Sequence, residues 1–425
     1  MKPKPVAPNM YIKGFKTELD PNNEQRTMFA KHSGTARFVY NWAMATLEED
    51  YGKGKGKKEL RPTSITLHKL LNTKKDTEFP WMRETSKWAA QNSTRQIEEA
   101  YKRFFKHISK FPKKKKKGKK DSFTLDSPIH VYEDKIQLPI IGKVRLKEKG
   151  YLPTGDPKSA TISLKAGRWF VSVKYECVKP TTSWTDDSIG VDLGIKTFAT
   201  FSDGTTIPTK NKLKEKEKCL KRLQRKMARQ AKESNSRDKT KKRIAKLHFH
   251  ISNTRKDLIH QTTTLLAKTK SAKRIVIEDL NVKGMMKNHK LSKAIANIGC
   301  YEFRRQLTYK CATYGKELVV ADRWFPSSKT DHKTGDIIYN LKLSDRIIYH
   351  EDGTRTDRDL NAAINLAKYQ GVNQLTKNVE SNNTVRHTGI NAGGEGKSIS
   401  LELDSVERCP SRKPEKNKES IRERL

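Results

Sequence analysis

Residues 188–207, SIGVDLGIKTFATFSDGTTI, decide the fold class of the second half of the chain. A short polar connection separates two runs rich in β-branched and aromatic residues, and the second run ends at an Asp-Gly turn signal, so two strands are expected. Further apolar runs at 274–278 and 317–321 predict strands, and a helix is expected over 291–314. Strands that alternate with helices indicate an α/β domain.

The first half of the chain has a different pattern. A β-like opening at 11–19 precedes a largely helical segment at 22–107, and short strands with turns follow over 122–178. We expect these strands and the opening strand to close a small β-barrel, into which the helices are inserted as a lobe. Phe38 and Trp42 belong to an aromatic stripe at helical spacing. The stripe predicts buried core, with a base-stacking surface as the alternative.

The chain is strongly basic. It carries 89 Lys and Arg against 48 Asp and Glu, a formal net charge of +41. So much like charge destabilises a compact protein unless a polyanion neutralises it, which argues against an ordinary metabolic enzyme and indicates a nucleic-acid partner. No apolar run is long enough to span a membrane and no signal peptide is recognisable, so a cytoplasmic protein, held at the nucleoid through DNA, is expected. The five cysteines form no CxxC pair, so neither disulfides nor a cysteine zinc site is predicted.

Two segments concentrate the positive charge. The lysine run at 113–120 cannot fold on itself, because adjacent ammonium groups repel one another; it is either a solvated linker or a phosphate contact, and the net charge favours contact. A helical hairpin predicted over 212–270 carries 18 Lys and Arg but 4 Asp and Glu within 211–256. The residues expected to contact nucleic acid are Lys113, Lys114, Lys115, Lys116, Lys117, Lys119, Lys120, Arg222, Arg225, Lys226, Arg229, Lys242 and Arg243.

Three carboxylates occupy positions where burial of a charge would cost free energy. Asp192 and Glu278 each end an apolar strand, and Asp359 lies in the first turn of a helix. Each also has an ordinary structural explanation, since Asp359 fits a helix cap and Glu278 begins an acidic turn. If the three meet at the carboxyl ends of the strands, their repulsion requires a hard divalent cation, Mg²⁺ or Mn²⁺. Two such ions can hydrolyse a phosphodiester.

Four sequence blocks carry a family resemblance. They lie at 190–204, 275–285, 320–330 and 357–368 and read GVDLGIKTFATFSDG, IVIEDLNVKGM, VADRWFPSSKT and DRDLNAAINLAK. In this order and spacing they resemble the RuvC-type blocks of the TnpB family, the RNA-guided DNA endonucleases of insertion sequences and relatives of compact type V CRISPR effectors. The resemblance covers nearly all of 10–370. It implies that Asp192, Glu278 and Asp359 are the catalytic, metal-binding acids, with Asp357 the second choice for the third position.

The resemblance also implies an architecture and partners. A RuvC nuclease domain of RNase H type, at 184–326 and 354–370, would be joined to a β-barrel wedge domain at 1–20 and 121–183. The wedge would carry a helical recognition lobe at 21–120 that ends in the basic loop. The chain would bind a guide RNA and double-stranded target DNA, as a monomer in the RNA complex. Residues 371–425 are polar and poor in aromatics, and we expect a largely disordered tail.

An insertion at 327–353 departs from the family pattern. Relatives carry two CxxC pairs there, which form a zinc ribbon, whereas this chain reads DHKTG at 331–335 and YHEDG at 349–353. Without its thiolates the degenerate ribbon is not expected to bind zinc, and we expect a metal-free hairpin. The polar residues are expected to be surface residues. The alternative is a substitute metal site with nitrogen and oxygen ligands, formed by Asp331, His332, His350 and Asp352.

The predicted function is that of an RNA-guided DNA endonuclease of a transposable element. Base pairing with the guide would select the target, the wedge and helical lobe would read a short flanking motif, and the acids would support two-metal phosphodiester hydrolysis. One alternative is an RNA-guided DNA-binding protein with weak nuclease activity, which the lost thiolates suggest. Another is a transposase that joins DNA ends with three carboxylates.

Overall fold

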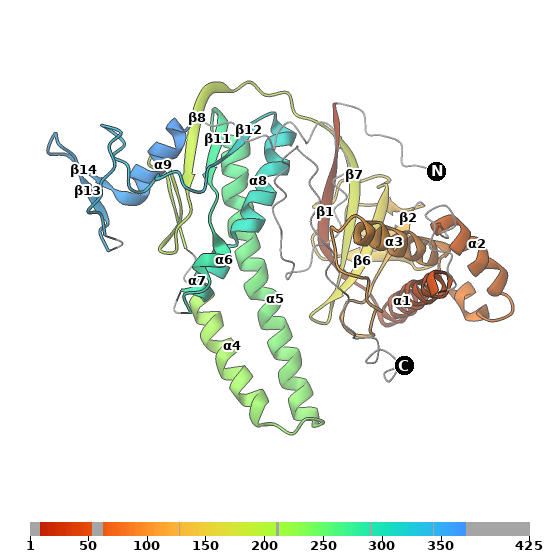
Figure 1. The fold of residues 1–425 in the computed structure, drawn as a ribbon. Coiled ribbons are helices and arrows are strands. Elements are labelled where there is room, and N and C mark those ends of the chain that lie inside the picture. The colour runs from red at the N-terminus through yellow and green to blue at the C-terminus, as the bar shows by residue number, and fades with distance from the viewer. Residues whose placement is uncertain are drawn as a thin grey trace, which may run out of the picture. The chain divides into compact units, whose positions relative to one another are not determined.

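The computed structural model describes residues 9–52, 63–126, 128–209, 212–289, 291–342 and 344–370 (Figure 1). The tail predicted over 371–425 lies outside the described residues, as do positions 1–8 of the predicted wedge. Within the described part of the chain, no helix is long and apolar enough to cross a membrane.

Strand β1 (Met10–Asp20) organises the sheet of the first half. It pairs with β7 through residues 10–18 and with β5 through residues 19 and 20, so one strand joins both parts of a seven-stranded sheet. The strand order is β2-β6-β7-β1-β5-β4-β3. The other strands are β2 (Ser122–Asp126), β3 (His130–Val131), β4 (Lys135–Leu138), β5 (Gly142–Leu146), β6 (Ser159–Lys165) and β7 (Arg168–Val178).

The prediction of a closed β-barrel is wrong for the described residues. Strands β2 and β3 stand at opposite ends of the strand order and do not pair with each other. Strand β3 has 2 residues, which offer too few hydrogen bonds to join the two edges. Its Val131 forms a bridge with Gly155 instead. The strands predicted from the sequence are present, but the sheet that they form is open.

The helices of the first half share their core with this sheet. The predicted helical segment is confirmed as α1 (Asn23–Gly52), α2 (Ser64–Lys74), a 3₁₀ turn (Pro80–Glu84) and α3 (Lys87–Phe105). Phe29 of α1 and Ala89 of α3 are fully buried in the same cluster as Phe123 of β2. The helical lobe is therefore packed onto the sheet through apolar side chains. Phe38 and Trp42 of the predicted stripe are half-buried and pack against Val39 and Leu71 within the lobe, not against the sheet.

The second half contains the α/β unit that the sequence predicted. Its five strands have the order β10-β9-β8-β11-β12, in which β8, β11 and β12 are parallel. The 203–204 turn signal connects β9 to β10, and Gly204 has a φ of 82°, which glycine adopts without strain. The bounds are β8 (Thr185–Asp192), β9 (Thr197–Phe201), β10 (Thr206–Pro208), β11 (Ala272–Glu278) and β12 (Glu317–Ala321).

The two faces of this sheet have different covers. Ile189 and Ile275 belong to a buried cluster that includes Ile259 of α5 (Asn235–Thr264) and Phe303 of α8 (Cys300–Tyr314). The alternate residues face the other way, and Val276 packs in a second cluster with Leu366 of α9 (Arg358–Lys368). Because side chains alternate along a strand, both faces of β11 are apolar, which explains its continuous apolar sequence.

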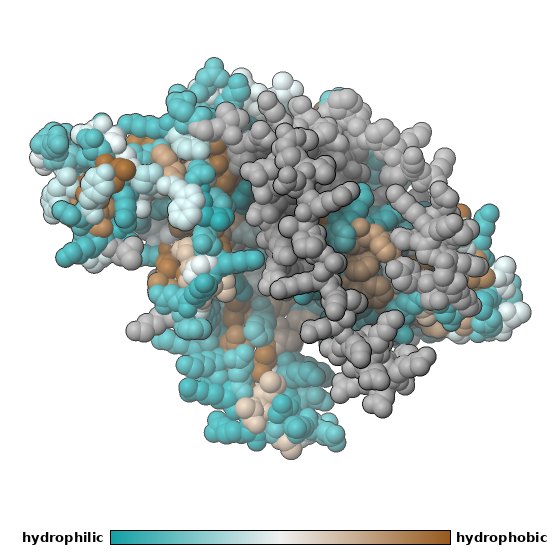
Figure 2. Space-filling view, in the orientation of Figure 1, coloured by the Kyte–Doolittle hydropathy of each residue, from teal (hydrophilic) through white to brown (hydrophobic). Residues whose placement is uncertain are grey.

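A helical hairpin follows β10. It consists of α4 (Lys212–Arg229) and α5, as predicted, although the break comes at 230–234 rather than at 233–237. Figure 2 shows mostly hydrophilic residues over the tip of this hairpin. The single helix predicted over 291–314 is wrong. Two helices, α7 (Ser292–Ile298) and α8, meet at Gly299, whose φ of 70° interrupts the helical backbone.

Helix α9 approaches β8 most closely at Gly190. A Cβ atom added there would lie 1.9 Å from the carbonyl oxygen of Ala363 and 2.5 Å from the backbone nitrogen of Ala367. Backbone atoms cannot move aside without displacing the helix. The absence of a side chain at this position therefore sets the distance between α9 and the sheet.

We expect Gly190→Ala to lower the free energy of unfolding by about 1–3 kcal/mol, because overpacking forces α9 away from the sheet. Thermal melting of the purified protein measures the effect. Gly14→Ala on β1 is the matched control, since a Cβ at Gly14 meets nothing within 4 Å. Equal melting temperatures for Gly190→Ala and the control would contradict the close packing.

Candidate active site

Asp192 and Glu278 end neighbouring parallel strands. Strands β8 and β11 pair in register up to the residues that precede the two acids. Paired residues of parallel strands point to the same face, and side chains alternate along each strand. Asp192 therefore lies on the face of Gly190, and Glu278 on the face of Val276, which is the face that α9 covers. The sheet brings together two acids that are 86 positions apart in the sequence.

Asp359 reaches the same place from α9. The close contact at Gly190 holds this helix along β8, with its first turn beyond the end of the strand. Asp359 Oδ2 lies 3.9 Å from the position of a Cβ atom at Gly194, two residues after Asp192. The third acid predicted from the sequence is thus held beside the first.

Asp357 caps the helix. Its Oδ1 accepts hydrogen bonds from the backbone nitrogens of Asp359, at 2.8 Å, and Leu360, at 3.4 Å. A cap of this kind satisfies N–H groups that have no partner within the helix. From the sequence, helix capping was the ordinary explanation for Asp359. The cap is Asp357 instead, and the Asp359 carboxylate lies beside the other two acids.

The pKa values of all three carboxyl groups are raised. Burial, followed by the charges of Asp359 and Glu278, raises the pKa of Asp192 to about 7. Burial is also the largest cause that raises the pKa values of Glu278 and Asp359, with further contributions from Asp279 and Asp357 respectively. Raised values at all three positions mean that the local protein charge does not compensate three carboxylates.

This donor set fits a hard divalent cation. Carboxylate oxygens are the ligands that Mg²⁺ and Mn²⁺ prefer, and a cation would remove the repulsion. Among the described residues, Arg346 forms an ion pair with this group, but its Nη1 lies 3.8 Å from Asp359 Oδ1, beyond hydrogen-bond distance. The charge of Arg358 also lowers the pKa values of Asp192 and Asp359, but burial and the neighbouring carboxylates outweigh it and both values stay raised. The residues present therefore fit the metal ions predicted from the sequence.

Sequence reasoning missed two groups beside the acids. Asp279, interpreted as a turn residue, binds Arg304 Nη1 at 3.2 Å and Arg323 Nη2 at 2.6 Å. Arg358, between the two acids of the DRD block, is buried and donates through Nη1 to the carbonyl of Lys342 at 2.9 Å. The partners of Asp279 are 25 and 44 residues away, so no local pattern could have identified them.

Three family models match parts of the chain. Their descriptions are "Probable transposase" at residues 170–289, "Helix-turn-helix domain" at 10–56 and "Cas12f1-like, TNB domain" at 301–366. A protein of Streptomyces pristinaespiralis named "Putative RNA-guided DNA endonuclease" is 32% identical over 360 residues, which cover 83% of this chain and 88% of that protein. "Putative RNA-guided DNA endonuclease InsQ" of Escherichia coli (strain K12) is 32% identical over 336 residues, covering 75% and 82%. The chain belongs to the TnpB family.

A solved structure shares the fold of this TnpB protein. The chain aligns with a protein in the cryo-EM structure of the Cas12f1-sgRNA-target DNA complex with a TM-score of 0.52 and 13% sequence identity. The alignment covers 84% of this chain and 99% of the other. At this identity the similarity concerns the fold alone, and it confirms the mixed α/β architecture that the sequence predicted.

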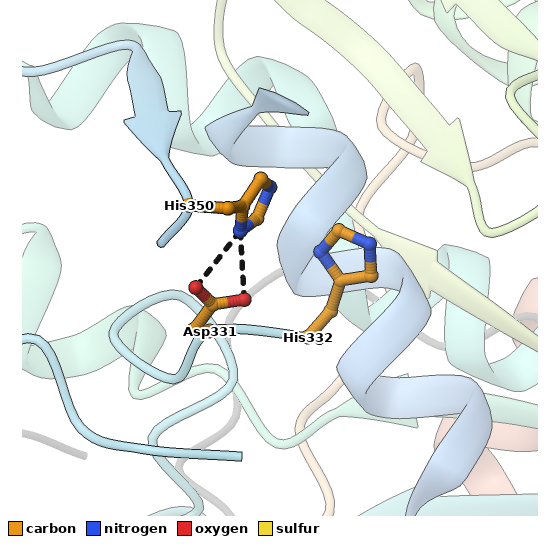
Figure 3. A group of neighbouring side chains, drawn as sticks. All are labelled: Asp331, His332 and His350. Carbon is orange, nitrogen blue, oxygen red and sulfur yellow. Dashed lines mark hydrogen bonds and ion pairs between the residues drawn. The ribbon is translucent and has the colours of Figure 1, made fainter. Parts of the chain in front are cut away.

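The degenerate ribbon of this TnpB protein brings three of its four candidate ligands together. Single ligand atoms of Asp331, His332 and His350 lie within 4.8 Å of one another (Figure 3). Asp331 and His350 are 5% and 6% exposed, so the expectation that they are surface residues is wrong. Asp352 does not belong to the group; it accepts a hydrogen bond from Lys333 Nζ.

Protein groups satisfy the buried pair without a metal. His350 Nδ1 lies 2.8 Å from both oxygens of the Asp331 carboxylate and donates to it, and His350 Nε2 is 2.7 Å from the hydroxyl of Thr356. His332 Nδ1 is 2.9 Å from Asn361 Oδ1. Every polar side-chain atom of this buried pair has a hydrogen-bond partner, and the metal-free ribbon stays a prediction.

Helix α9 also holds the start of the ribbon. Asn361 Nδ2 donates to the carbonyl of Thr330 at 2.7 Å, and Asn365 Nδ2 donates to the carbonyl of Ser327 at 2.9 Å. Both asparagines are buried. Their spacing of four residues places both asparagines on one face of the helix, a local signal in the sequence for this contact.

The basic residues predicted to contact nucleic acid are mostly exposed. Lys115 is the exception: its Nζ lies 4.1 Å from the centroid of the Tyr40 ring and donates to Gln96 Oε1 at 2.8 Å. It anchors the lysine run to the helical lobe rather than presenting its charge to solvent. The exposed members are Lys113, Lys114, Lys116, Lys117, Lys119, Lys120, Arg222, Arg225, Lys226, Arg229, Lys242 and Arg243.

We expect Asp192→Asn to raise the melting temperature at pH 8 in the absence of divalent cations. The pKa of Asp192 rises from its ordinary value of 3.8 to about 7 on folding. Wild-type stability is therefore present in full below pH 3.8 and is lost as the pH rises through about 7. The variant lacks this loss, and the two proteins should melt alike below the lower value. Melting temperature against pH, in a chelating buffer, measures the difference.

Asp186→Asn is the matched control for this experiment. Asp186 lies on the same strand, β8, but its side chain is 92% exposed. The melting-temperature difference between Asp192→Asn and wild type should increase with pH, and that of the control should not. A difference that does not increase, or that increases equally in the control, would contradict the repulsion among the acids.

We expect the purified protein to contain no stoichiometric zinc, because the ribbon lacks its thiolates and the buried His350 is already fully hydrogen-bonded. Elemental analysis measures the content, and a zinc chelator should leave the melting temperature unchanged. His350→Ala should lower stability by about 1–3 kcal/mol, because the buried Asp331 carboxylate loses the imidazole donor to both its oxygens and keeps only the backbone N–H of Lys333. One zinc ion per chain that is lost in His332→Ala and His350→Ala would instead support the substitute metal site.

Proposed function

We propose that this protein is an RNA-guided DNA endonuclease of a transposable element, which cleaves its target by metal-dependent phosphodiester hydrolysis. The observation that carries the proposal is the convergence of Asp192, Glu278 and Asp359 at the ends of β8 and β11 and the start of α9. Membership of a family whose curated relatives are named RNA-guided DNA endonucleases supports the reaction and the partners.

The roles of the residues follow from their chemistry. Asp192, Glu278 and Asp359 would hold Mg²⁺ or Mn²⁺ through their carboxylate oxygens. When held there, such cations would supply a nucleophilic water at neutral pH and would neutralise the charge on the departing oxygen of the phosphodiester. Asp357 positions Asp359 by capping α9, and the Arg304 and Arg323 pairs of Asp279 fix the chain that follows Glu278.

Target choice would rest on base pairing rather than on protein contacts to bases. A guide RNA would pair with one DNA strand, and the exposed basic residues of the α4–α5 hairpin would bind nucleic-acid backbone without regard to sequence. The sheet and helical lobe of the first half would read a short motif next to the target. An RNA that co-purifies with the protein distinguishes this function from that of a transposase that joins DNA ends itself.

We expect Asp192→Ala, Glu278→Ala and Asp359→Ala each to abolish Mg²⁺-dependent cleavage of a target matched to the co-purified RNA. Binding of RNA and target should be nearly unchanged, because the acids would hold metal ions and do not grip the backbone. Cleavage and filter-binding assays with the same preparations separate the two effects. Cleavage retained by any variant would remove that residue from the site.

Asp357→Ala is the matched control for the third acid. Loss of the helix cap should cost about 1 kcal/mol of stability while cleavage continues. If Asp357→Ala abolishes cleavage and Asp359→Ala does not, the two acids have exchanged roles. If all variants bind target but wild type does not cleave it, the protein is a guided binding protein.

A further inference from the structure

Two cavities lie side by side on helix α1 of the helical lobe. They are open depressions with volumes of about 500 Å³ and 420 Å³, and both are lined by Gly34 and Arg37. Pockets of this size hold small organic groups such as nucleobases. A Cβ atom at Gly34 would lie 3.9 Å from the Arg37 guanidinium, an ordinary van der Waals contact.

Aromatic rings wall both cavities. Phe38 lines the first cavity and Trp81 lines the second. The two rings meet edge to face with their centroids 5.2 Å apart, and Phe38 contacts Phe79 in the same way at 4.9 Å. Trp81 is nevertheless 42% exposed. A ring that is held by neighbours and still open to solvent is a preformed stacking surface.

Cations stand at the junction and at the rim. Arg37, common to both cavities, is held by Asp121 at 3.2 Å. Lys114 lines the first cavity, and its neighbour Lys115 is fastened to α1 through Asn41, whose Oδ1 accepts from Lys115 N at 2.7 Å and whose Nδ2 donates to Lys115 O at 3.0 Å. The anchored lysine therefore places the exposed one. Lys31, which also lines the second cavity, is ion-paired with the lining carboxylate of Glu84, so Lys114 is the exposed cation at the rim.

We propose that this double cavity binds two consecutive unpaired nucleotides of RNA, one base in each cavity, with the linking phosphate beside Arg37 and Lys114. The proposal deepens the proposed function, on which it rests for the presence of RNA. Aromatic walls bind bases of any sequence by stacking, and the cations bind the phosphate between them.

RNA fits the site better than target DNA does. A base in duplex DNA is paired and stacked, so it enters a cavity only after it has been extruded. Folded RNA presents splayed bases in its loops and bulges, and proteins recognise these by stacking them on aromatic side chains. The cavities lie on the lobe that carries the basic run, whose positive charge attracts RNA and DNA alike. The aromatic walls favour unpaired RNA bases over duplex DNA.

The test measures the affinity of the purified protein, freed of bound RNA, for a uridine oligonucleotide and for a mixed-sequence DNA duplex of equal length. Trp81→Ala should weaken RNA binding about tenfold by loss of a stacking surface, and Trp81→Phe should restore most of it. Lys114→Ser should reduce the slope of log affinity against log salt by about 0.7 for RNA. Ultraviolet cross-linking to RNA should label the peptides that contain Phe38 and Trp81.

Lys69→Ser is the matched control, since Lys69 is an exposed lysine of the same lobe that lines neither cavity. Equal effects of Lys114→Ser and Lys69→Ser would reduce the site to general charge and overturn the proposal. So would unchanged RNA affinity in Trp81→Ala, or an equal loss of duplex DNA binding. None of these measurements involves cleavage, so failure of the nuclease assay and failure of this site are separate results.

Discussion

The contact between the backbones of α9 and β8 at Gly190 is the constraint on which the candidate site depends. It is so close that a single methyl group would meet the helix backbone at 1.9 Å. Because α9 lies flat on that face of the sheet, its first turn comes level with the ends of β8 and β11. Asp359 therefore arrives beside Asp192 and Glu278, although the three acids come from distant parts of the chain.

The electrostatic state of the site follows from this geometry. Burial and mutual repulsion raise the pKa of Asp192 to about 7, so the protein alone stabilises the charged acids poorly. A buried acid with a raised pKa lowers the stability of the fold at neutral pH, and such acids are typical of functional sites. Asp357 accepts the hydrogen bonds of the backbone N–H groups at the start of α9. The Asp359 carboxylate is therefore not needed as the helix cap.

The degenerate ribbon shows how a module can keep its attachments without the thiolates of its relatives. Asp331 and His350, from the two halves of the insertion, form a buried hydrogen-bonded pair, and Asn361 and Asn365 of α9 hold the segment that leads into it. The helix that carries the third acid therefore also supports the ribbon.

The sequence by itself determined most strands of both sheets, the helical lobe, the basic hairpin and the three acids as candidates, because apolar periodicity, turn residues and carboxylates at strand ends are local signals. The short strands β3, β4 and β10 were not predicted. Tertiary structure alone decided that the first sheet stays open, that Lys115 turns inward, that Gly299 divides a helix, and that Asp357 rather than Asp359 is the cap. It also decided the pairing of Asp331 with His350. These outcomes depend on contacts between distant segments and on backbone geometry at single residues, which residue spacing does not specify.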